Sequence, residues 1–513
     1  MGGTDMELYT AAGMKATEAA ACGLGVSYEA MMQRAGQMAA DLILRENNLV
    51  GRPCLVYCGR GNNGGDGYAA ARRLLQCGVP AVAAAAGGPP KSAQALEMYR
   101  RALEAGVQVV DTEDPAVAEL CRSAAVVVDA LCGTGFSGEL RPDVLQCCQQ
   151  INQAPGRVYA LDLPTGVCAD DGRAAQGSVR AAVTVTFHGY KPGQLILPGR
   201  TCCGRVERAD IGIPRQAEQP SAFFEYVERP YVQRRLPVRP QECNKGTFGR
   251  LLAVVGGASY MGAALLAAGA ALRSGAGYVV LASTEKVCDI LLPSVPECVM
   301  LHCPADEDGC ISSRALPAIL ERAQASTAVL LGCGLGTGEG AAAVVRGLLQ
   351  NSPVPVVLDA DGINLAARDI EMLQKRRCKL ILTPHPAEFA RLLGRGTAEV
   401  LANRLELGQE FARRYDVTLL LKGSCTMVFT PDGVCRLADA GTPGLARAGS
   451  GDVLAGLIGG LAAQGFAPQD AAACGAWLHG RAGTLAAASR SVTAMLPRDV
   501  SASLSDAFLE CGR

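Results

Sequence analysis

Cys58-Gly-Arg-Gly-Asn-Asn-Gly-Gly-Asp-Gly-Tyr68 (CGRGNNGGDGY) is a glycine-rich loop between a short apolar run, Cys54-Leu-Val-Tyr57, and a helix-like run, YAAARRLLQCG. Three of its glycines spell G-x-G-x-x-G, the pattern of a dinucleotide-binding turn between a strand and a helix. The loop therefore predicts a layered α/β fold and raises the question of a dinucleotide ligand.

The stretch that follows the loop argues against a redox dinucleotide cofactor. Such a fold needs an acidic residue about 20 residues past the glycines to hold the ribose. The corresponding stretch, GVPAVAAAAGGPPKS, has no acid. The loop itself carries Asn62, Asn63 and Asp66, and a carboxylate disfavours a bare pyrophosphate beside the backbone N–H groups.

Composition indicates a globular protein of more than one domain. The chain has 513 residues, 49% hydrophobic residues and a net charge of −1, which gives no hint of a nucleic-acid partner. Its 22 cysteines include no C-x-x-C, and no apolar segment follows Met1, so we expect the reducing cytoplasm and no disulfide framework. The longest apolar helices are too short to span a bilayer. We also expect a homo-oligomer.

Apolar runs alternate with helical patterns from about residue 50 onward, which predicts parallel sheets with helices on both faces. The expected strands of the first half are Leu55–Cys58, Val79–Ala85, Val107–Val110, Ala125–Asp129, Val158–Asp162 and Ala182–Phe187. The expected strands of the second half begin at Leu251 and include Ala328–Leu331, Pro355–Asp359, Leu380–Leu382 and Val417–Leu421. A stretch rich in proline and charge after Pro214 predicts a linker and the lead-in to a second domain. We therefore expect domains at residues 1–218 and 222–513.

Three predicted strands of the first half end in polar side chains. These are Asn63 in the opening loop, Asp129, and Asp162 with the nearby Thr165. The carboxyl ends of parallel strands are where ligands bind in a doubly wound sheet, and amide, carboxylate and hydroxyl oxygens suit a hard cation. Any one Asp could instead be an ordinary helix cap.

Together these motifs resemble those of the NAD(P)H-hydrate epimerases, over roughly residues 8–215. The stretches that carry the resemblance are LYTAAGMKATE, MMQRAG, GNNGGDG, VDALCGTGFSG, LDLPTG and TVTFHGYKPGQLILPGR. The resemblance implies a Rossmann-like doubly wound domain and a potassium ion bound by Asn63, Asp129 and Thr165. It also implies a damaged nicotinamide nucleotide bound by Asn62, Asn63, Gly64, Gly65, Asp66, Gly133, Thr134, Gly135, Phe136, Ser137, Gly138, Glu139 and Asp162.

The dinucleotide of the opening question would thus be a substrate. The hydrate carries a hydroxyl on the carbon next to the ring nitrogen, so it is a carbinolamine whose configuration is lost when the nitrogen expels the oxygen or the ring opens. Either route needs a positioned acid or base. Asp162 is the group that we expect to supply it.

The second domain contains a further glycine-rich helix start, DAGTPGLARAGSGDVLAGLIGGLAAQG. Backbone N–H groups at such a start form an anion hole, and Asp452 beside it can take a proton from a hydroxyl that attacks a phosphate. The chain has no G-x-x-x-x-G-K-S/T, which excludes a P-loop enzyme. The alternative for this stretch is an Asp helix cap before a packed helix.

Further motifs make the second domain similar to the ribokinase-like superfamily, and more narrowly to the ADP-dependent NAD(P)H-hydrate dehydratases, over about residues 236–500. They are NKGTFGRLLAVVGGASYMGAALLAAGAALRSGAG, GCGLG, LDADGIN, TPHPAE and AGSGDVLAGLIGGLAAQG. The resemblance implies that the hydrate contacts Ala263, Gly334, His385 and Asp452. The adenine nucleotide would contact Lys422, Gly423, Ser424, Cys425, Thr426 and Gly451. The family often has Pro where this chain has Cys333.

The two resemblances imply a bifunctional enzyme that repairs the hydrates of NADH and NADPH (NADHX and NADPHX). The first domain would interconvert the R and S hydrates with K⁺, and the second would dehydrate the S form with ADP and Mg²⁺, giving AMP and phosphate. Two alternatives stay open. The second domain could be an ATP-dependent vitamin-precursor kinase, or the first domain could be a non-catalytic binding module.

Overall fold

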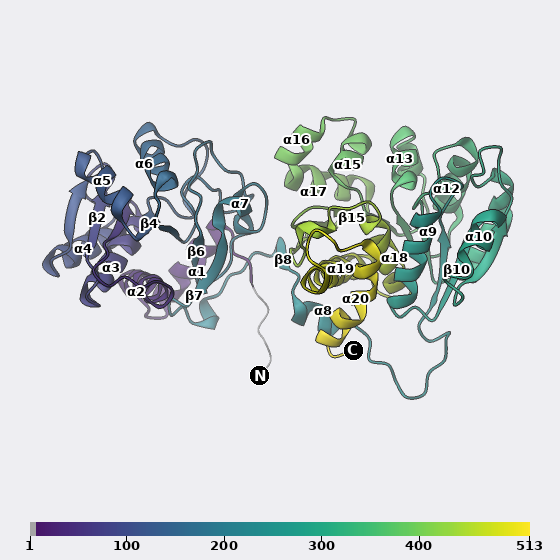
Figure 1. Ribbon diagram of the computed structural model, residues 1–513, viewed down its shortest axis with the longest axis horizontal. Coiled ribbons are helices and arrows are strands. Elements are labelled where there is room, and N and C mark those ends of the chain that lie inside the picture. The colour runs from purple at the N-terminus through teal and green to yellow at the C-terminus, as the bar shows by residue number, and fades with distance from the viewer. Residues whose placement is uncertain (1–6) are drawn as a thin grey trace. The chain divides into compact units, whose positions relative to one another are not determined.

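The computed structural model describes residues 7–513, which form two compact units (Figure 1). The first unit ends at Ala222 and the second begins at Phe223. The start of the chain, on which the expectation of no secretory segment depends, lies outside the described residues.

The first unit is a parallel sheet of seven strands in the order β3-β2-β1-β4-β5-β6-β7. The chain passes from β1 outward to β3 and then returns to the other side of β1, so the order reverses between β1 and β4. A crevice at the carboxyl ends of the strands is expected at that point. The strands are β1 (Cys54–Cys58), β2 (Ala81–Ala85), β3 (Gln108–Asp111), β4 (Val126–Ala130), β5 (Arg157–Leu161), β6 (Val183–Phe187) and β7 (Arg205–Ala209). The helices are α1 (Ala11–Gly23), α2 (Tyr28–Glu46), α3 (Asn62–Gln76), α4 (Ala93–Glu104), α5 (Pro115–Ser123), α6 (Pro142–Gln153) and α7 (Gly199–Cys203).

Alternation along β1 explains the layers of this unit. Cys54, Val56 and Cys58 are buried in a core with residues of α2, α3 and α4. Leu55 and Tyr57 point to the other face and are buried with residues of α5 and α6. All five strand residues are buried, so the run is continuously apolar, as is typical of a parallel strand covered on both faces.

The second unit contains a sheet of ten strands in the order β11-β10-β9-β12-β13-β14-β15-β16-β17-β8. The strands from β11 to β15 are parallel, whereas β16 is antiparallel to both of its neighbours. The strands are β8 (Phe224–Tyr226), β9 (Arg250–Val254), β10 (Tyr278–Thr284), β11 (Val299–Cys303), β12 (Ala328–Leu331), β13 (Val356–Leu358), β14 (Leu380–Leu382), β15 (Thr418–Leu421), β16 (Thr426–Phe429) and β17 (Cys435–Ala438). The order reverses between β9 and β12, which again predicts a crevice where these strands end.

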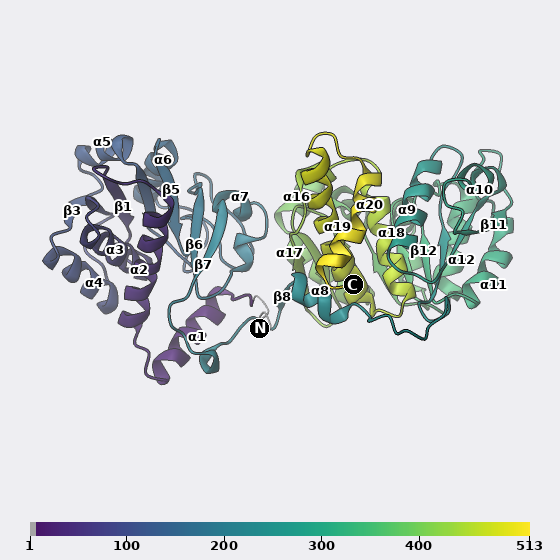
Figure 2. The ribbon, with the colours of Figure 1, turned by 60° about the horizontal axis from the view of Figure 1, so that its bottom comes forward.

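The helices of the second unit cover both faces of its sheet (Figure 2). Leu251 and Ala253 of β9 pack with α9, α18 and α19 in one core, while Leu252 and Val254 are buried on the other face. The helices are α8 (Arg229–Arg235), α9 (Met261–Arg273), α10 (Glu285–Leu291), α11 (Leu316–Gln324), α12 (Glu339–Asn351), α13 (Asp361–Arg368), α14 (Glu371–Gln374), α15 (Pro386–Leu393), α16 (Thr397–Ala402), α17 (Arg404–Tyr415), α18 (Ser450–Ala463), α19 (Pro468–Arg490) and α20 (Pro497–Glu510).

The predicted α/β class with two layered domains is confirmed, and the predicted strands lie within two residues of observed ones. In the stretch after Pro214, Phe224–Tyr226 pairs with β17 and Arg229–Arg235 packs on α19, so the part that we expected to lead into the second domain lies in the second unit. Strand β8 itself was not predicted. The strands β7, β10, β11 and β17 were also not among those predicted.

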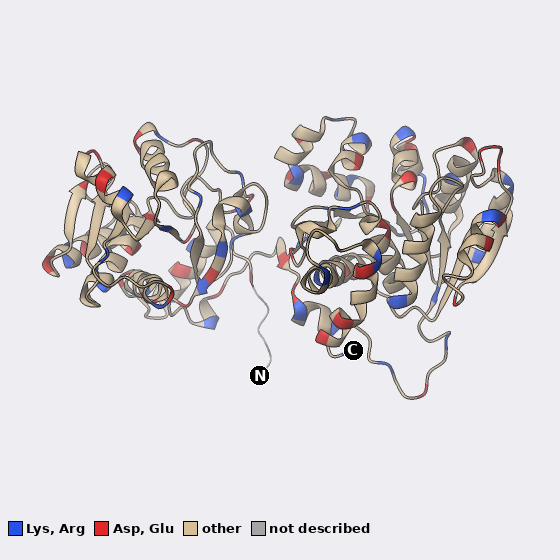
Figure 3. Cartoon of the chain, in the orientation of Figure 1, with Lys and Arg blue, Asp and Glu red and all other residues tan. Residues whose placement is uncertain are grey.

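All 22 cysteines are free. Positive and negative side chains are interspersed on the helices of each unit (Figure 3). Among residues 7–513, every helix is too short or too polar to cross a bilayer.

We predict that the first unit needs the residues after 218. The Gln219 N–H donates to Thr17 Oγ1 at 3.0 Å and the Ser221 N–H donates to Leu8 O at 2.8 Å. A fragment of residues 1–222 should therefore be more stable than one of residues 1–218 by about 1–3 kcal/mol, at about 0.5–1.5 kcal/mol for each hydrogen bond. Thermal unfolding followed by circular dichroism measures the difference.

Residues 222–513 serve as the complementary fragment and should also fold, because they retain β8. Equal stability of the two N-terminal fragments would contradict the boundary. Insolubility of fragments 1–222 and 222–513 would show that neither unit is independent.

Candidate active sites

A cavity of about 890 Å³ lies at the carboxyl edge of the first sheet, between the ends of β1, β4 and β5 and helix α1. Most of the residues predicted to contact substrate line it. They are Asn62, Asn63, Asp66, Gly133, Thr134, Gly135, Phe136, Ser137, Glu139 and Asp162.

The predicted contacts Gly64, Gly65 and Gly138 are not among the lining residues. A Cβ atom on Gly64 would lie 1.8 Å from the carbonyl oxygen of Gly59, and one on Gly65 would lie 2.4 Å from the sulfur of Met32. These two glycines allow the loop and α3 to pack closely. Their contact with substrate stays a prediction.

Asp162 follows β5 and faces a buried lysine. Lys191 Nζ lies 2.5 Å from Asp162 Oδ1, and the lysine is 0% exposed. The ammonium also donates to Thr186 Oγ1 and to the Phe187 carbonyl, each at 3.0 Å. Asp162 has a φ of 64°, and its carbonyl accepts a hydrogen bond of 2.7 Å from Gln194 Nε2. The carboxylate is thus held firmly at the cavity wall.

Two further carboxyl groups of the cavity have raised proton affinities. Burial, with the negative charges of Asp162 and Glu18, raises the pKa of Asp66 well above its usual value. Burial, followed by the charge of Asp162, raises the pKa of Glu18 to about 7, although Lys191 lowers it. The cavity therefore combines an ion-paired carboxylate, Asp162, with two carboxyl groups whose pKa values are raised mainly by burial.

The three residues predicted to bind a cation are linked to one another. Thr165 donates to Asp129 through its hydroxyl and its N–H, both at 2.7 Å, and its hydroxyl accepts from the Cys132 N–H at 3.0 Å. A Cβ on the next residue, Gly133, would lie 3.3 Å from Asn63 Oδ1. Asn63 therefore adjoins the Asp129–Thr165 pair.

This group fits a monovalent cation. Asp129 is 0% exposed and has no ion-pair partner among residues 7–513, and burial raises its pKa to about 6. Neither end of the buried Asn63 amide has a hydrogen-bond partner. A buried amide oxygen without a protein partner next to a buried carboxylate suits a hard cation.

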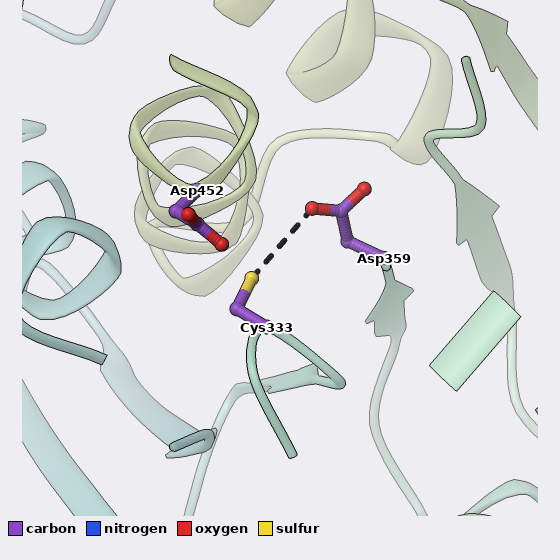
Figure 4. A group of neighbouring side chains, drawn as sticks. All are labelled: Cys333, Asp359 and Asp452. Atoms are coloured by element: carbon purple, nitrogen blue, oxygen red, sulfur yellow. Dashed lines mark hydrogen bonds between the residues drawn. The ribbon is translucent and has the colours of Figure 1, made fainter. Parts of the chain in front are cut away.

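The second unit gathers Asp452, Asp359 and Cys333 at the carboxyl edge of its sheet (Figure 4). Asp452 comes from the first turn of α18, Asp359 follows β13, and Cys333 lies in the loop after β12. Their side-chain donor atoms lie within 4.8 Å of one another. Burial, followed by the charge of Asp359, raises the pKa of Asp452 to about 6.

Asp359 is the anchored member of this group. Lys422 Nζ lies 3.0 Å from its Oδ1 atom, and the hydroxyl of Thr383 donates to the same oxygen at 2.7 Å. The Cys333 thiol donates to Oδ2 at 3.7 Å, and burial raises its pKa well above the usual value. A protonated thiol and a lysine-paired carboxylate do not make a ready magnesium site.

The predicted nucleotide-binding residues adjoin this group. Lys422 to Cys425 form the turn between β15 and β16, Thr426 begins β16, and a Cβ on Gly451 would lie 3.4 Å from Lys422 Nζ. The lysine therefore meets the N-terminus of α18, where backbone N–H groups and a cation together attract phosphate. On the other side, a Cβ on Gly334 would lie 2.9 Å from that of Ala263, so these two predicted hydrate contacts are neighbours.

His385 caps helix α15 at the carboxyl edge of the sheet. Its Nδ1 atom accepts the N–H groups of Ala387 and Glu388, and Glu388 accepts the N–H of His385, which forms a capping box for α15. Burial lowers the pKa of His385. Glu388 lies 3.8 Å from Lys422, so the histidine borders the same site.

Several residues of the two sites were not singled out from the sequence. Lys191 and Glu18 lie in quoted motifs, TVTFHGYKPGQ and LYTAAGMKATE, but nothing in those letters marks them as lining a cavity. Asp359 ends a predicted strand in the motif LDADGIN. An acidic residue at the end of a strand is the signal that could have marked it as a site residue.

The folds and the two edge sites define an α/β enzyme with a separate site in each unit. A family model described as YjeF-related protein N-terminus matches residues 28–193, and one described as NAD(P)H-hydrate dehydratase matches residues 252–506. The bifunctional NAD(P)H-hydrate repair enzyme Nnr of Moorella thermoacetica is 38% identical, over 92% of this chain and 90% of its own. The enzyme of the same name from Escherichia coli is 32% identical, over 94% of this chain and 90% of its own.

The chain belongs to the family of bifunctional NAD(P)H-hydrate repair enzymes. A solved structure of ADP/ATP-dependent NAD(P)H-hydrate dehydratase from Bacillus subtilis, co-crystallised with ATP and Mg²⁺, is 31% identical and covers 56% of this chain and 98% of its own, with a TM-score of 0.49. Family membership confirms the predicted resemblance and favours it over a vitamin-precursor kinase or a non-catalytic binding module.

We predict that Lys191→Met destabilises the first unit by about 3–5 kcal/mol, because it leaves Asp162 as an unpaired buried charge. The double variant Lys191→Met/Asp162→Asn should recover part of this loss, since both members are then neutral. Urea unfolding at pH 7 measures the three free energies and gives the coupling between the two residues. Equal midpoints for wild type and Lys191→Met would show that the ion pair does not form in solution.

Proposed function

We propose that the first unit interconverts the R and S hydrates of NADH and NADPH, and that the second dehydrates the S form with ADP. The products are AMP, phosphate and restored NADH or NADPH. The observation that carries the proposal is that each unit places a lysine-paired carboxylate beside a second buried carboxyl group at the carboxyl edge of its sheet, Asp162 with Glu18 and Asp359 with Asp452. Self-association and a cytoplasmic location remain predictions from the sequence.

In the first unit, Asp162 is the acid/base group for the carbinolamine. The dinucleotide lies along the cavity wall formed by the start of α3 and the loop Gly133–Glu139. Asn63, Asp129 and Thr165 hold the potassium ion, which supplies positive charge beside the buried Asp129 carboxylate. Their linked oxygens and the unpartnered Asn63 amide support this assignment.

In the second unit, Asp452 takes the proton of the hydrate hydroxyl as its oxygen attacks the terminal phosphorus of ADP. The bond from that phosphorus to the bridging oxygen breaks, and AMP leaves with the electron pair. The ring nitrogen then expels phosphate from the ring carbon, and loss of a proton from the adjacent carbon restores the reduced nicotinamide. Phosphate leaves more readily than hydroxide, which is the chemical reason for the nucleotide.

The nucleotide phosphates lie against Lys422 and the N-terminus of α18, and Gly423–Thr426 and Gly451 complete their binding site. Mg²⁺ bound to the ADP phosphates would screen their charge beside Lys422. Ala263, Gly334 and His385 border the hydrate. The proximity of Gly334 to Ala263 and of Gly451 to Lys422 supports this arrangement.

Asp452→Asn should lower ADP-dependent dehydration about 10²–10⁴-fold, because the amide cannot accept the hydroxyl proton. Gly449 is the N-cap of α18 and no side chain caps the helix, so a role of Asp452 limited to its negative charge in the first turn predicts a small effect. In wild type, dehydration should fall as the pH drops through about 6, where the base becomes protonated. Absorbance of reduced nicotinamide follows the reaction, and near wild-type turnover of the variant would exclude Asp452 as the base.

Asp162→Asn should abolish epimerisation and leave dehydration of pure S hydrate unchanged. The assay starts from mixed hydrates with excess ADP, and the matched control is the S hydrate alone. Wild type should repair the whole mixture, whereas the variant should stop when the S form is consumed. Complete repair by the variant, faster than spontaneous epimerisation, would place the acid/base group elsewhere.

A further inference from the structure

Glu18 lines the cavity of the first unit from an element that does not belong to the sheet. Helix α1 contributes Lys15 and Glu18 to the lining, whereas the sheet edge contributes Asp162 and Lys191. The helix is anchored at two positions that precede Glu18. The Ala11 N–H donates to Asp170 Oδ1 at 2.6 Å, and the hydroxyl of Thr17 accepts the Gln219 N–H at 3.0 Å. Glu18 therefore lines the cavity from a helix that hydrogen bonds hold in place.

The charged and titratable groups around Glu18 come from several elements. They are Asp162 and Lys191 from the sheet edge, Asp66 from α3, Tyr28 from α2, and Lys15 and Cys22 from α1 itself. Burial is the first cause of the raised pKa of Glu18, about 7, and the charge of Asp162 is the second. Near neutral pH the cavity thus contains a carboxyl group that can give a proton and a lysine-paired carboxylate that can take one. Such a division is typical of paired acid and base groups.

We propose that Glu18 is a second catalytic residue of the first unit, which exchanges protons with the hydrate in partnership with Asp162. The proposal rests on the epimerase function proposed above.

In the proposed epimerisation, one proton leaves Glu18 and one proton is taken up by Asp162. Protonated Glu18 gives its proton to the hydroxyl oxygen, the carbon–oxygen bond breaks with its electrons on oxygen, and water leaves as the ring nitrogen forms a double bond to that carbon. A water molecule then adds to the other face of the carbon, and Asp162 takes its proton. The reverse reaction starts from protonated Asp162 and ionised Glu18. In either direction, the reaction needs one of the two residues, Glu18 or Asp162, protonated and the other ionised.

The test compares Glu18→Gln with wild type in the full chain. Epimerisation is followed without ADP, by chromatographic separation of the R and S hydrates, so the second unit is silent. We expect the rate to fall about 10²–10⁴-fold, the usual range for loss of an acid/base group. The matched control is Glu29→Gln, on the adjacent helix α2 and outside the cavity lining, which should keep the wild-type rate.

The pH profile separates proton transfer from a structural role. Wild-type epimerisation should decline as the pH rises above about 7, because Glu18 then loses the shared proton. The residual rate of Glu18→Gln should lack this decline. A variant within threefold of wild type, or one that keeps the alkaline decline, would overturn the proposal.

Stability provides a second control. The folded-state pKa of Glu18 exceeds its usual value of 4.5, so its contribution to stability is present below that pH and is lost as the pH rises toward about 7. Gln does not ionise, so Glu18→Gln does not lose stability as the pH rises. At pH 8 this variant should melt at or above the melting temperature of the wild type. A lower melting temperature would assign Glu18 a structural role. A wild-type protein without epimerase activity would instead overturn the proposed function of the first unit.

Discussion

Burial of carboxyl groups at the carboxyl edges of two parallel sheets is the constraint on which both sites depend. An ionised carboxylate taken out of water is costly unless a cation or several hydrogen bonds compensate it. Each unit meets this need with one lysine. Lys191 lies 2.5 Å from Asp162 in the first unit, and Lys422 lies 3.0 Å from Asp359 in the second. Lys191 follows β6 and Lys422 follows β15, so each lysine reaches the carboxyl edge of its sheet from a strand beyond the reversal point.

One lysine does not compensate every carboxyl group of its site, and the remainder take up protons. The pKa of Glu18 is raised to about 7 and that of Asp452 to about 6, in each case by burial first and by the neighbouring paired carboxylate second. The charge of each lysine-paired carboxylate therefore helps to raise the pKa of a second carboxyl group beside it. Groups in that range are the most effective proton carriers at neutral pH.

The sequence predicted the layers and the central strands because a strand buried on both faces is continuously apolar, as in β1. It missed five strands, of which β7, β8 and β11 are edge strands and β10 and β17 are not. Strand β7 (RVERA) has three charged residues out of five, and β8 spans only Phe224–Tyr226 within a stretch rich in proline, so neither has the pattern of a buried strand. The glycine-rich loops and strand-end aspartates located both sites, but Lys191 and Glu18 reach the cavity only through tertiary packing. No local pattern records that packing.

The two units use their carboxyl pairs differently, and the reactions explain why. In the mechanism proposed for the first unit, epimerisation removes and returns a hydroxyl, so its site needs both an acid and a base, the roles that we propose for Glu18 and Asp162. In the mechanism proposed for the second unit, phosphoryl transfer needs one base, because Lys422 and the start of α18 would meet the charge that develops on the departing nucleotide. Asp359 pairs with that lysine, and its charge also raises the pKa of Asp452. On this proposal the two units differ because one lysine pairs with the carboxylate that would react, whereas the other adjoins the proposed nucleotide site.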